Sequence, residues 1–267
     1  MNKFRRTPIH WLPALAGLGC AAVAQNSITG PADLVNTISQ RYQQAKQYSF
    51  EGDLEISRRA GTEKPKEVLL KARVRFLAAS PGKYLLRAEK PSSPLYTIVS
   101  DGQKTWAYVP AFKRYTEREA SGSARQVDPE AGLDVQSNGK GDLADEFCRL
   151  VVPILAGLAK SVEVTDLRGS LLSVLSKRDA TGRQNMTYLT LDTATLDIRR
   201  ISWMNATPAD NGDKVLVRSD LTFATFRIGD SISDADFMFQ PPKDAKRVDS
   251  LPATTGRATT SKGRSLH

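Results

Sequence analysis

The sequence contains little histidine and cysteine, and this scarcity excludes several kinds of catalytic site. Its 267 residues include two histidines, His10 and His267, and two cysteines, Cys20 and Cys148. Without a histidine in the body of the chain there is no Ser-His or Cys-His pair and no histidine metal cluster. One cysteine in the body of the chain cannot form an internal disulfide. We therefore expect a protein that is not an enzyme and that needs no metal or other cofactor.

The sequence also lacks a basic tract with interleaved aromatic residues, which a nucleic-acid groove would need. The formal net charge is +9, and without the three basic residues of the N-terminal segment, Lys3, Arg5 and Arg6, it is +6. A modest excess that is spread along the chain favours solubility or weak attraction to anionic head groups. Hydrophobic residues make up 40% of the chain, which is enough for an ordinary globular core. We expect a monomer that has no nucleic-acid partner.

The first 24 residues have the pattern of a cleavable export signal. The three basic residues precede an apolar stretch, Ile9 to Ala24, which Pro13 interrupts and which is too short to span a bilayer comfortably. Ala22-Val23-Ala24 is a small-x-small cleavage site. We predict cleavage after Ala24 and a periplasmic location for the remaining chain.

Cys20 offers an alternative, because a cysteine at the end of an export signal can carry a lipid anchor. Such signals place Leu three residues before the cysteine, and Gly17 occupies that position here. The adjacent Arg5 and Arg6 suggest twin-arginine export, but Pro8 stands where that signal has a bulky apolar residue. General secretion without a lipid anchor is therefore the favoured interpretation.

A helix and two long strands are predicted after the signal. Apolar residues recur at helical spacing over 31–47, and Pro31 suits the first turn of a helix. The period then changes to two, and apolar and polar residues alternate over 48–57 and 68–77. Strict alternation is typical of a strand with one apolar face and one face in water.

The charges on these two strands predict how the strands pair. Acids lie on the polar face of the first strand and bases on that of the second, so a hairpin centred near Thr62-Glu63 brings them together. A slip by one residue would turn the charged row inward, so we expect a firm register. The predicted pairs are Glu55–Lys71, Asp53–Arg73, Glu51–Arg75, Phe50–Phe76 and Leu54–Ala72.

The rest of the chain continues mainly as strands. A second helix is predicted over 142–159, with a kink at Pro153, an exposed loop over 119–141 and a disordered tail over 249–267. Residues 25–248 are expected to form one domain. The further predicted strands are 83–89, 95–100, 103–109, 113–118, 161–167, 170–178, 185–192, 197–204 and 214–228. The fold class is mainly β with α (α+β), in which a curved antiparallel sheet must cover its apolar face with the two helices.

Paired carboxylates are the one catalytic chemistry that these counts leave open. Asp142, Asp145 and Glu146 lie on one face of the second predicted helix, at its start. Acids at a helix N-terminus complement the helix dipole, and we interpret the three residues in this way. A hydrolase that uses carboxylates remains as a third hypothesis.

Two motifs resemble those of a known family. The segment Val99 to Pro110 (VSDGQKTWAYVP) is similar to a hairpin of the LolA-type lipoprotein carriers, and Phe237 to Lys246 (FMFQPPKDAK) is similar to their closing segment. Leu189 to Asp192, followed by Ile198 to Ile201, resembles the strand pair between them, and the order and spacing match over roughly 34–250.

The resemblance implies a fold and a function. It implies a periplasmic, unclosed β-barrel with helices as a lid over its concave face, and a hydrophobic cavity that holds the acyl chains of a lipid or lipoprotein. It also implies transport proteins of the inner or outer membrane as partners, and a role in outer-membrane sorting. The wider superfamily (LolA- and LolB-like proteins) includes envelope sensors as well as carriers.

One position departs from the family pattern. The carriers have an arginine before a proline at the start of the third strand, where it bonds to the lid and gates ligand release. Ser80-Pro81 stands at that position here. Arg75 and Arg87 are the two arginines that would substitute for it from other positions.

An acyl chain needs an apolar concave surface, and the alternation predicts which residues provide it. Burial is worth about 0.8 kcal/mol per methylene, so an open apolar hollow is the main requirement, with Lys71, Arg73 and Arg75 pointing away from it. In the hairpin 95–109 both faces are apolar, so the pattern does not show which one faces the cavity. The candidate lipid-binding residues are Phe50, Leu54, Ile56, Leu70, Val74, Phe76, Leu86, Trp106, Phe147, Val151 and Ile154.

The sequence thus favours a carrier of lipid or lipoprotein acyl chains. The alternative is an envelope sensor or protein-interaction module on the same fold. The two differ in one structural expectation: a carrier has room in its apolar hollow, whereas a sensor has a filled core and binds its partner on the outer surface.

Overall fold

The structure is a computed structural model, and several sequence predictions lie outside the residues that it describes. Those predictions are the export signal with Cys20, the turn at 62–63, Ser80-Pro81, residues 121–139 of the expected loop and residues 252–267 of the expected tail. Among the described residues no helix is both long and apolar enough to cross a membrane. The described residues are 30–61, 65–79, 82–91, 93–120, 140–160, 162–176, 185–192, 194–208 and 214–251.

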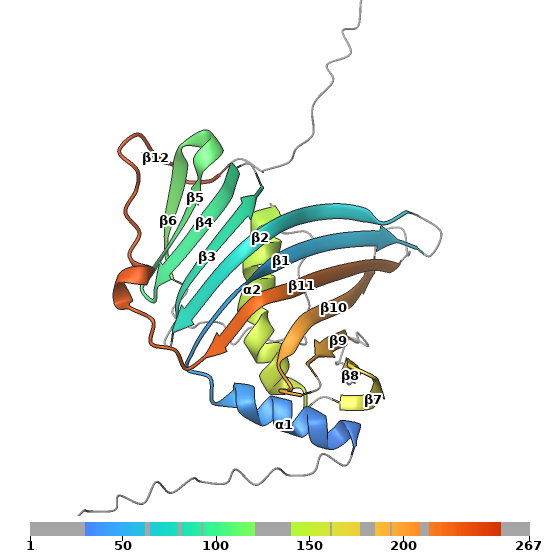
Figure 1. The fold of residues 1–267 in the computed structure, drawn as a ribbon. Helices are drawn as coiled ribbons and strands as arrows, with labels where there is room; N and C mark the ends of the chain where they lie inside the picture. Colours follow the sequence, from blue (N-terminus) through green and yellow to red (C-terminus); the bar gives the residue numbers. More distant parts are fainter. Residues whose placement is uncertain are drawn as a thin grey trace, which may run out of the picture.

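One large sheet dominates the described structure (Figure 1). Its strand order is β12-β6-β5-β4-β3-β2-β1-β11-β10-β9-β8-β7, so β12 and β7 are its two edges and the sheet is unclosed. Neighbouring strands are antiparallel except β12 and β6, which are parallel. The strands are β1 (Gln47–Ala60), β2 (Glu67–Ala79), β3 (Lys83–Lys90), β4 (Ser93–Asp101), β5 (Lys104–Val109), β6 (Arg114–Glu119), β7 (Val162–Arg168), β8 (Leu171–Ser176), β9 (Met186–Leu191), β10 (Ile198–Pro208), β11 (Lys214–Ile228) and β12 (Lys246–Arg247).

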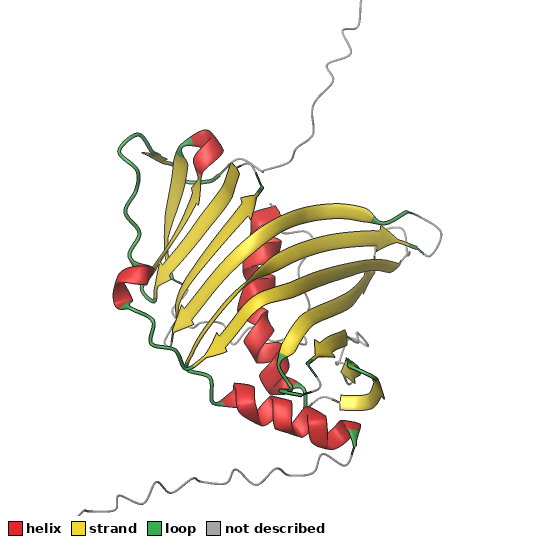
Figure 2. Cartoon of the chain, in the orientation of Figure 1, coloured by secondary structure: helices red, strands yellow, loops and turns green. Residues whose placement is uncertain are grey.

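Two α-helices lie on one side of this sheet. Helix α2 (Lys140–Gly157) runs behind the strands and the sheet curves around it, while α1 (Pro31–Gln43) crosses its lower end (Figure 2). Two short 3₁₀ helices, η1 (Pro110–Phe112) and η2 (Asp234–Phe237), complete the described elements. The architecture is mainly β with α, as predicted, and is consistent with a curved half-barrel.

The expected elements match the observed ones closely, with one clear difference at the first helix. The pattern predicts a helix to residue 47, but α1 ends at Gln43. Gln47 belongs to β1 instead, where it pairs with Ala79 of β2. Sheet pairing on both sides of β1 therefore outweighs helix propensity in this segment.

The predicted pairing of the first hairpin is confirmed. All five predicted pairs are opposite one another in the register of β1 and β2. A bulge between Ile56 and Ser57 shifts the pairing only beyond them. The Glu55–Lys71 and Glu51–Arg75 ion pairs measure 3.7 and 3.6 Å.

The sheet has two faces with different coverings. We call the face that packs against α2 the inner face, and its buried side chains form one large apolar cluster with both helices. Residues 229–248, here called the C-terminal strap, pack on the opposite, outer face. Under the strap Phe237 packs on a second apolar cluster, formed by Leu77, Ala79, Leu85 and Val99.

Gly52 allows β1 and β11 to approach each other on the inner face. It lies at a bulge in their pairing, and a Cβ atom added there would overlap the backbone carbonyl of Thr222. Any larger residue must therefore push the two strands apart.

We expect Gly52→Ala to lower the free energy of unfolding by about 1–3 kcal/mol, since overpacking a buried site forces the backbone to shift. Urea unfolding followed by circular dichroism measures the change. Gly157→Ala is the control, because Gly157 ends α2 with no heavy atom within 4 Å of its added Cβ. Equal effects of the two substitutions would contradict this account of Gly52.

Candidate functional site

Ten of the eleven candidate lipid-binding residues lie together on the inner face or on α2. Each is at most 7% exposed and all belong to the same apolar cluster. Their role in binding lipid stays a prediction, whereas their common location follows from the alternation of β1, β2 and β3 and from the stripe on α2. The ten are Phe50, Leu54, Ile56, Leu70, Val74, Phe76, Leu86, Phe147, Val151 and Ile154.

The expectation of an open apolar hollow needs correction, because α2 packs on this surface. Phe147 of α2 stacks on Trp203 of β10, with ring centroids 6.4 Å apart. Both side chains are almost fully buried. In the described conformation α2 therefore covers the surface that was expected to be open.

Trp106 does not share the inner face with the other ten candidates. It pairs across the hairpin with Val99, which belongs to the outer cluster, and its ring stacks on Phe239 of the strap at 6.1 Å. Tyr96 and Ile98 take the inner face instead. The sequence pattern did not show which face of this hairpin lies inward, because the outer face is also apolar where the strap covers it.

A cluster of aromatic rings extends the inner face beyond the predicted residues. Phe50 stacks on Phe76 at 5.1 Å and meets Phe223 and Phe226 of β11 edge-on at 5.5 and 5.8 Å. Alternating apolar residues over 215–223 are the sequence signal that would have identified the β11 contribution. The pairing of β11 with β1 joins segments about 170 residues apart, so local pattern does not reveal it.

Polar contacts hold the N-terminal half of α2 to the sheet. Asp145 lies 3.5 Å from the hydroxyl of Tyr84 on β3 and accepts a hydrogen bond from Nε of Arg149 at 3.2 Å. The Arg149 guanidinium also lies over the Tyr84 ring, 5.6 Å from its centroid. Burial raises the pKa of the Tyr84 hydroxyl, so this group stays protonated and can donate to Asp145. Asp145 therefore has a structural partner, which favours its interpretation as part of the helix over a catalytic role.

Other contacts hold the C-terminal half of α2 to α1. The hydroxyl of Ser39 and the side-chain amide of Gln43 both donate to the carbonyl of Ala156, the latter at 3.2 Å. Pro153 separates the two halves of α2. A proline inside a helix has no N–H to donate, so the carbonyl of Arg149, four residues before it, loses its helical hydrogen bond.

Arg75 and Arg87 do not substitute for the gating arginine of the carriers. They lie on the outer face, opposite each other on β2 and β3, and line a pocket there. Lys71 and Arg75 form ion pairs with acids of β1 on that face. The charged row thus points away from α2, as predicted, and Tyr84, Asp145 and Arg149 form a polar link between sheet and helix.

Two buried polar side chains on the inner face, Asn205 and Ser219, have no hydrogen-bond partner within the described part of the chain. Asn205 of β10 and Ser219 of β11 are 1% and 0% exposed. Neither amide atom of Asn205 nor the Ser219 hydroxyl bonds to any of the residues that the structure describes. Ser219 pairs with Trp203, and Asn205 lies two residues along the same strand, so the groups are diagonal neighbours. Such groups cost about 1–3 kcal/mol each when unsatisfied, and they form a polar position beside the apolar surface.

Comparisons with known proteins give no family for this chain. No protein-family model matches the sequence, and no curated protein matches it either. The LolA-type resemblance of the two motifs therefore stays a hypothesis.

Solved structures that are similar to the chain include the following three, each at low identity. An uncharacterized conserved protein from Thermus thermophilus shows a TM-score of 0.40 and 11% identity over 82% of this chain and 99% of its own. A DUF1329 family protein from Desulfovibrio piger shows 0.34 and 12% over 78% and 95%. A lipovitellin, solved to study lipid–protein interactions, shows 0.31 and 8% over 71% of this chain but 26% of its own. At these values the similarities carry no argument about function, which has to come from the site itself.

Proposed function

We propose that this protein is a carrier that holds the acyl chains of a lipid or lipoprotein between the inner face of its sheet and helix α2. The supporting observation is the composition of that interface. A broad apolar surface from β3 to β10 is covered by the amphipathic helix α2 together with α1. The predicted export signal supports a periplasmic location, where the protein would exchange cargo with membrane proteins of the envelope.

Binding is an exchange of one apolar covering for another. In the closed state Phe50, Phe76 and their neighbours are buried in the apolar cluster that α2 shares with the sheet, and an acyl chain in place of α2 would keep such a surface buried. Each methylene contributes about 0.8 kcal/mol, so a long chain can offset the contacts that α2 gives up. The contacts of Tyr84 with Asp145 and Arg149 add to the barrier, and a hydrogen bond of this kind contributes about 0.5–1.5 kcal/mol.

Pro153 divides α2 so that only the half before it needs to move when an acyl chain binds. The half before it carries Phe147 and Val151 over the sheet, and the half after it is bonded to α1. Because the helix has one hydrogen bond fewer at this point, the first half can lift while the second half stays bonded to α1.

Asn205 and Ser219 supply a polar position for the linkage of a lipid. An ester or amide group offers a carbonyl oxygen, which accepts from the Ser219 hydroxyl or from Nδ2 of Asn205. Satisfying these buried groups removes an existing cost of the closed state. The proposed cargo is therefore an acyl ester or amide rather than a hydrocarbon alone.

A sensor or interaction module on the same fold is the second candidate function. The closed packing of α2 over the inner face favours it, because a permanently filled core needs no ligand. The two candidates predict opposite behaviour of the inner face when lipid is added, and the following tests separate them.

A brominated acyl lipid is expected to quench Trp203, which is buried on the inner face against Phe147. The test uses protein beginning at Gln25 with Trp106→Phe, so that Trp203 is its one tryptophan. Dibromostearoyl phosphatidylcholine is titrated below vesicle-forming concentrations. The converse variant, Trp203→Phe, reports from the outer face and should be quenched much less by this zwitterionic lipid. Equal quenching, or none, would contradict the inner site.

Cys148 is expected to report the lifting of α2. Its thiol is fully buried, and burial raises its pKa well above the usual value. Raising the pH from 7 to 9 therefore leaves labelling of the closed protein by Ellman's reagent slow, since the thiolate is the reacting form. Saturating acyl lipid, or Tyr84→Phe, should increase the labelling rate severalfold. A rate that neither treatment changes would mean that α2 stays closed, which supports the second candidate function.

Ser219→Ala is expected to raise the free energy of unfolding by about 1 kcal/mol and to weaken the binding of acyl esters, because it removes an unpartnered buried hydroxyl. Ser202→Ala is the matched control, since the Ser202 hydroxyl donates to Asp220 on the outer face. It should lower stability and leave lipid affinity unchanged. Loss of stability in Ser219→Ala would show that this hydroxyl already has a partner in the closed state.

A further inference from the structure

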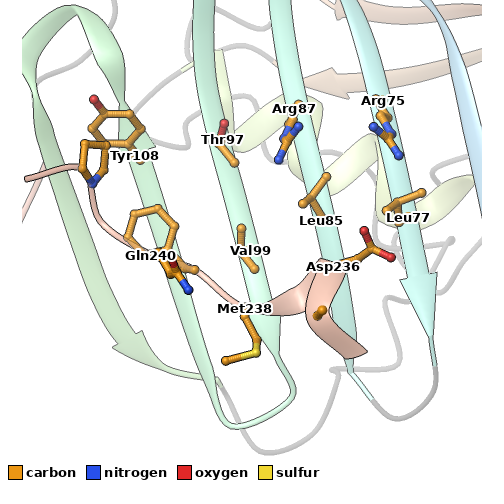
Figure 3. A pocket seen from close by; sticks show the side chains of 13 residues that line it. Arg75, Leu77, Leu85, Arg87, Thr97, Val99, Tyr108, Asp236, Met238 and Gln240 are labelled. Atoms are coloured by element: carbon orange, nitrogen blue, oxygen red, sulfur yellow. The ribbon is translucent and has the colours of Figure 1, made fainter. Parts of the chain in front are cut away.

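A separate pocket lies on the outer face, between the C-terminal strap and strands β2 to β5 (Figure 3). Its volume is about 560 Å³, within the usual range of small-molecule sites. Leu77, Leu85 and Val99 line its apolar part, and Arg75 and Arg87 lie side by side in the row of residues above them. The pocket therefore has an apolar end and a cationic end.

The two arginines are an unusual pair for a sheet surface. Arg75 and Arg87 are directly opposite in the register of β2 and β3, and like charges at such positions destabilise the pairing. Arg75 meets Glu51 at 3.6 Å, but Glu51 lies on β1, away from Arg87. Within the described part of the chain, Arg87 has no ion pair within 4 Å. The pair is thus only partly neutralised by the protein.

Of the two other acids near these arginines, Asp236 has another hydrogen-bond partner and Glu89 lies two residues further along β3. Glu89 follows Arg87 on the same face of β3 and lies opposite Arg73. Asp236 of the strap accepts a hydrogen bond from the backbone N–H of Ser233 at 3.2 Å, as part of the cap of η2. Figure 3 places Asp236 beside the leucines rather than between the arginines. An anion between the two guanidinium groups would therefore complete their neutralisation.

We propose that this pocket binds a single-chain amphiphile whose carboxylate or phosphate head lies between Arg75 and Arg87 and whose chain lies over Leu85 and Val99. Guanidinium groups recognise both kinds of oxyanion through paired hydrogen bonds. The hydroxyl of Thr97, next to Arg87 in the sheet register, adds a donor at the same end. Met238 and Phe239 of the strap cover the chain from the other side.

Trp106 provides a specific readout of this pocket. Its ring stacks on Phe239, which lines the pocket, so a ligand beneath the strap changes its surroundings. Trp203 lies on the opposite face of the sheet. Protein beginning at Gln25 with Trp203→Phe therefore reports on the outer pocket alone. The fluorescence of Trp106 therefore tests the outer pocket, and the fluorescence of Trp203 tests the proposed carrier function separately.

The test is a fluorescence titration with decanoate and decyl phosphate, each below its micelle-forming concentration. We expect a saturable change in Trp106 emission with at least one of the two, and their relative affinities identify a carboxylate or a phosphate head. Decanol and decyltrimethylammonium should bind at least tenfold more weakly. Arg75→Gln/Arg87→Gln should weaken anion binding at least tenfold, whereas Arg59→Gln, an exposed arginine on β1 outside the pocket, should leave it unchanged.

Circular dichroism and thermal unfolding establish that each variant is folded. If the double arginine variant does not fold, Arg87→Lys takes its place in the binding test. Lysine keeps the charge but lacks the planar fork, so it should weaken binding severalfold. Binding of decanol as tight as that of both anions, or affinity unchanged in the arginine variants, would overturn the proposal.

Discussion

The packing of α2 against the inner face is the interaction on which the rest of the structure depends. A sheet of this width presents a large apolar surface that must be covered, and α2 with α1 covers it. The cover is held by apolar contact over most of its area and by Tyr84, Asp145 and Arg149 at one position. Because apolar contact has no directional requirement, the same surface serves folding and, under the proposed function, the binding of an acyl chain.

Alternation along each strand separates this surface chemically from the outer one. On β2, Val74 and Phe76 point to the helix while Arg75 and Leu77 point to the strap. The two proposed sites therefore share strands but not side chains. The outer site depends on ion pairing and on the strap, and the inner site depends on the displacement of a helix. Each can be altered by substitution without touching the residues of the other.

The sequence predicted the strands well, because apolar and polar residues alternate along them and turn residues separate them. The register of β1 and β2 followed from complementary charges, Glu55 with Lys71 and Glu51 with Arg75. The local sequence does not show which distant segment of the chain covers which face of the sheet. The pairing of β11 with β1, the path of the strap and hence the placement of Trp106 on the outer face all depend on contacts far apart in sequence. The unpartnered Asn205 and Ser219 are visible only once burial is known.

The most direct test of an acyl-binding inner face is the lipid content of the protein itself. Protein purified from an expressing bacterial envelope without detergent is extracted with organic solvent, and the extract is quantified by mass spectrometry. The account predicts about one acyl lipid per protein molecule, and a much smaller amount from a variant such as Leu54→Glu that remains folded. Extracts without bound lipid, from protein that is folded and fully exported, would contradict it.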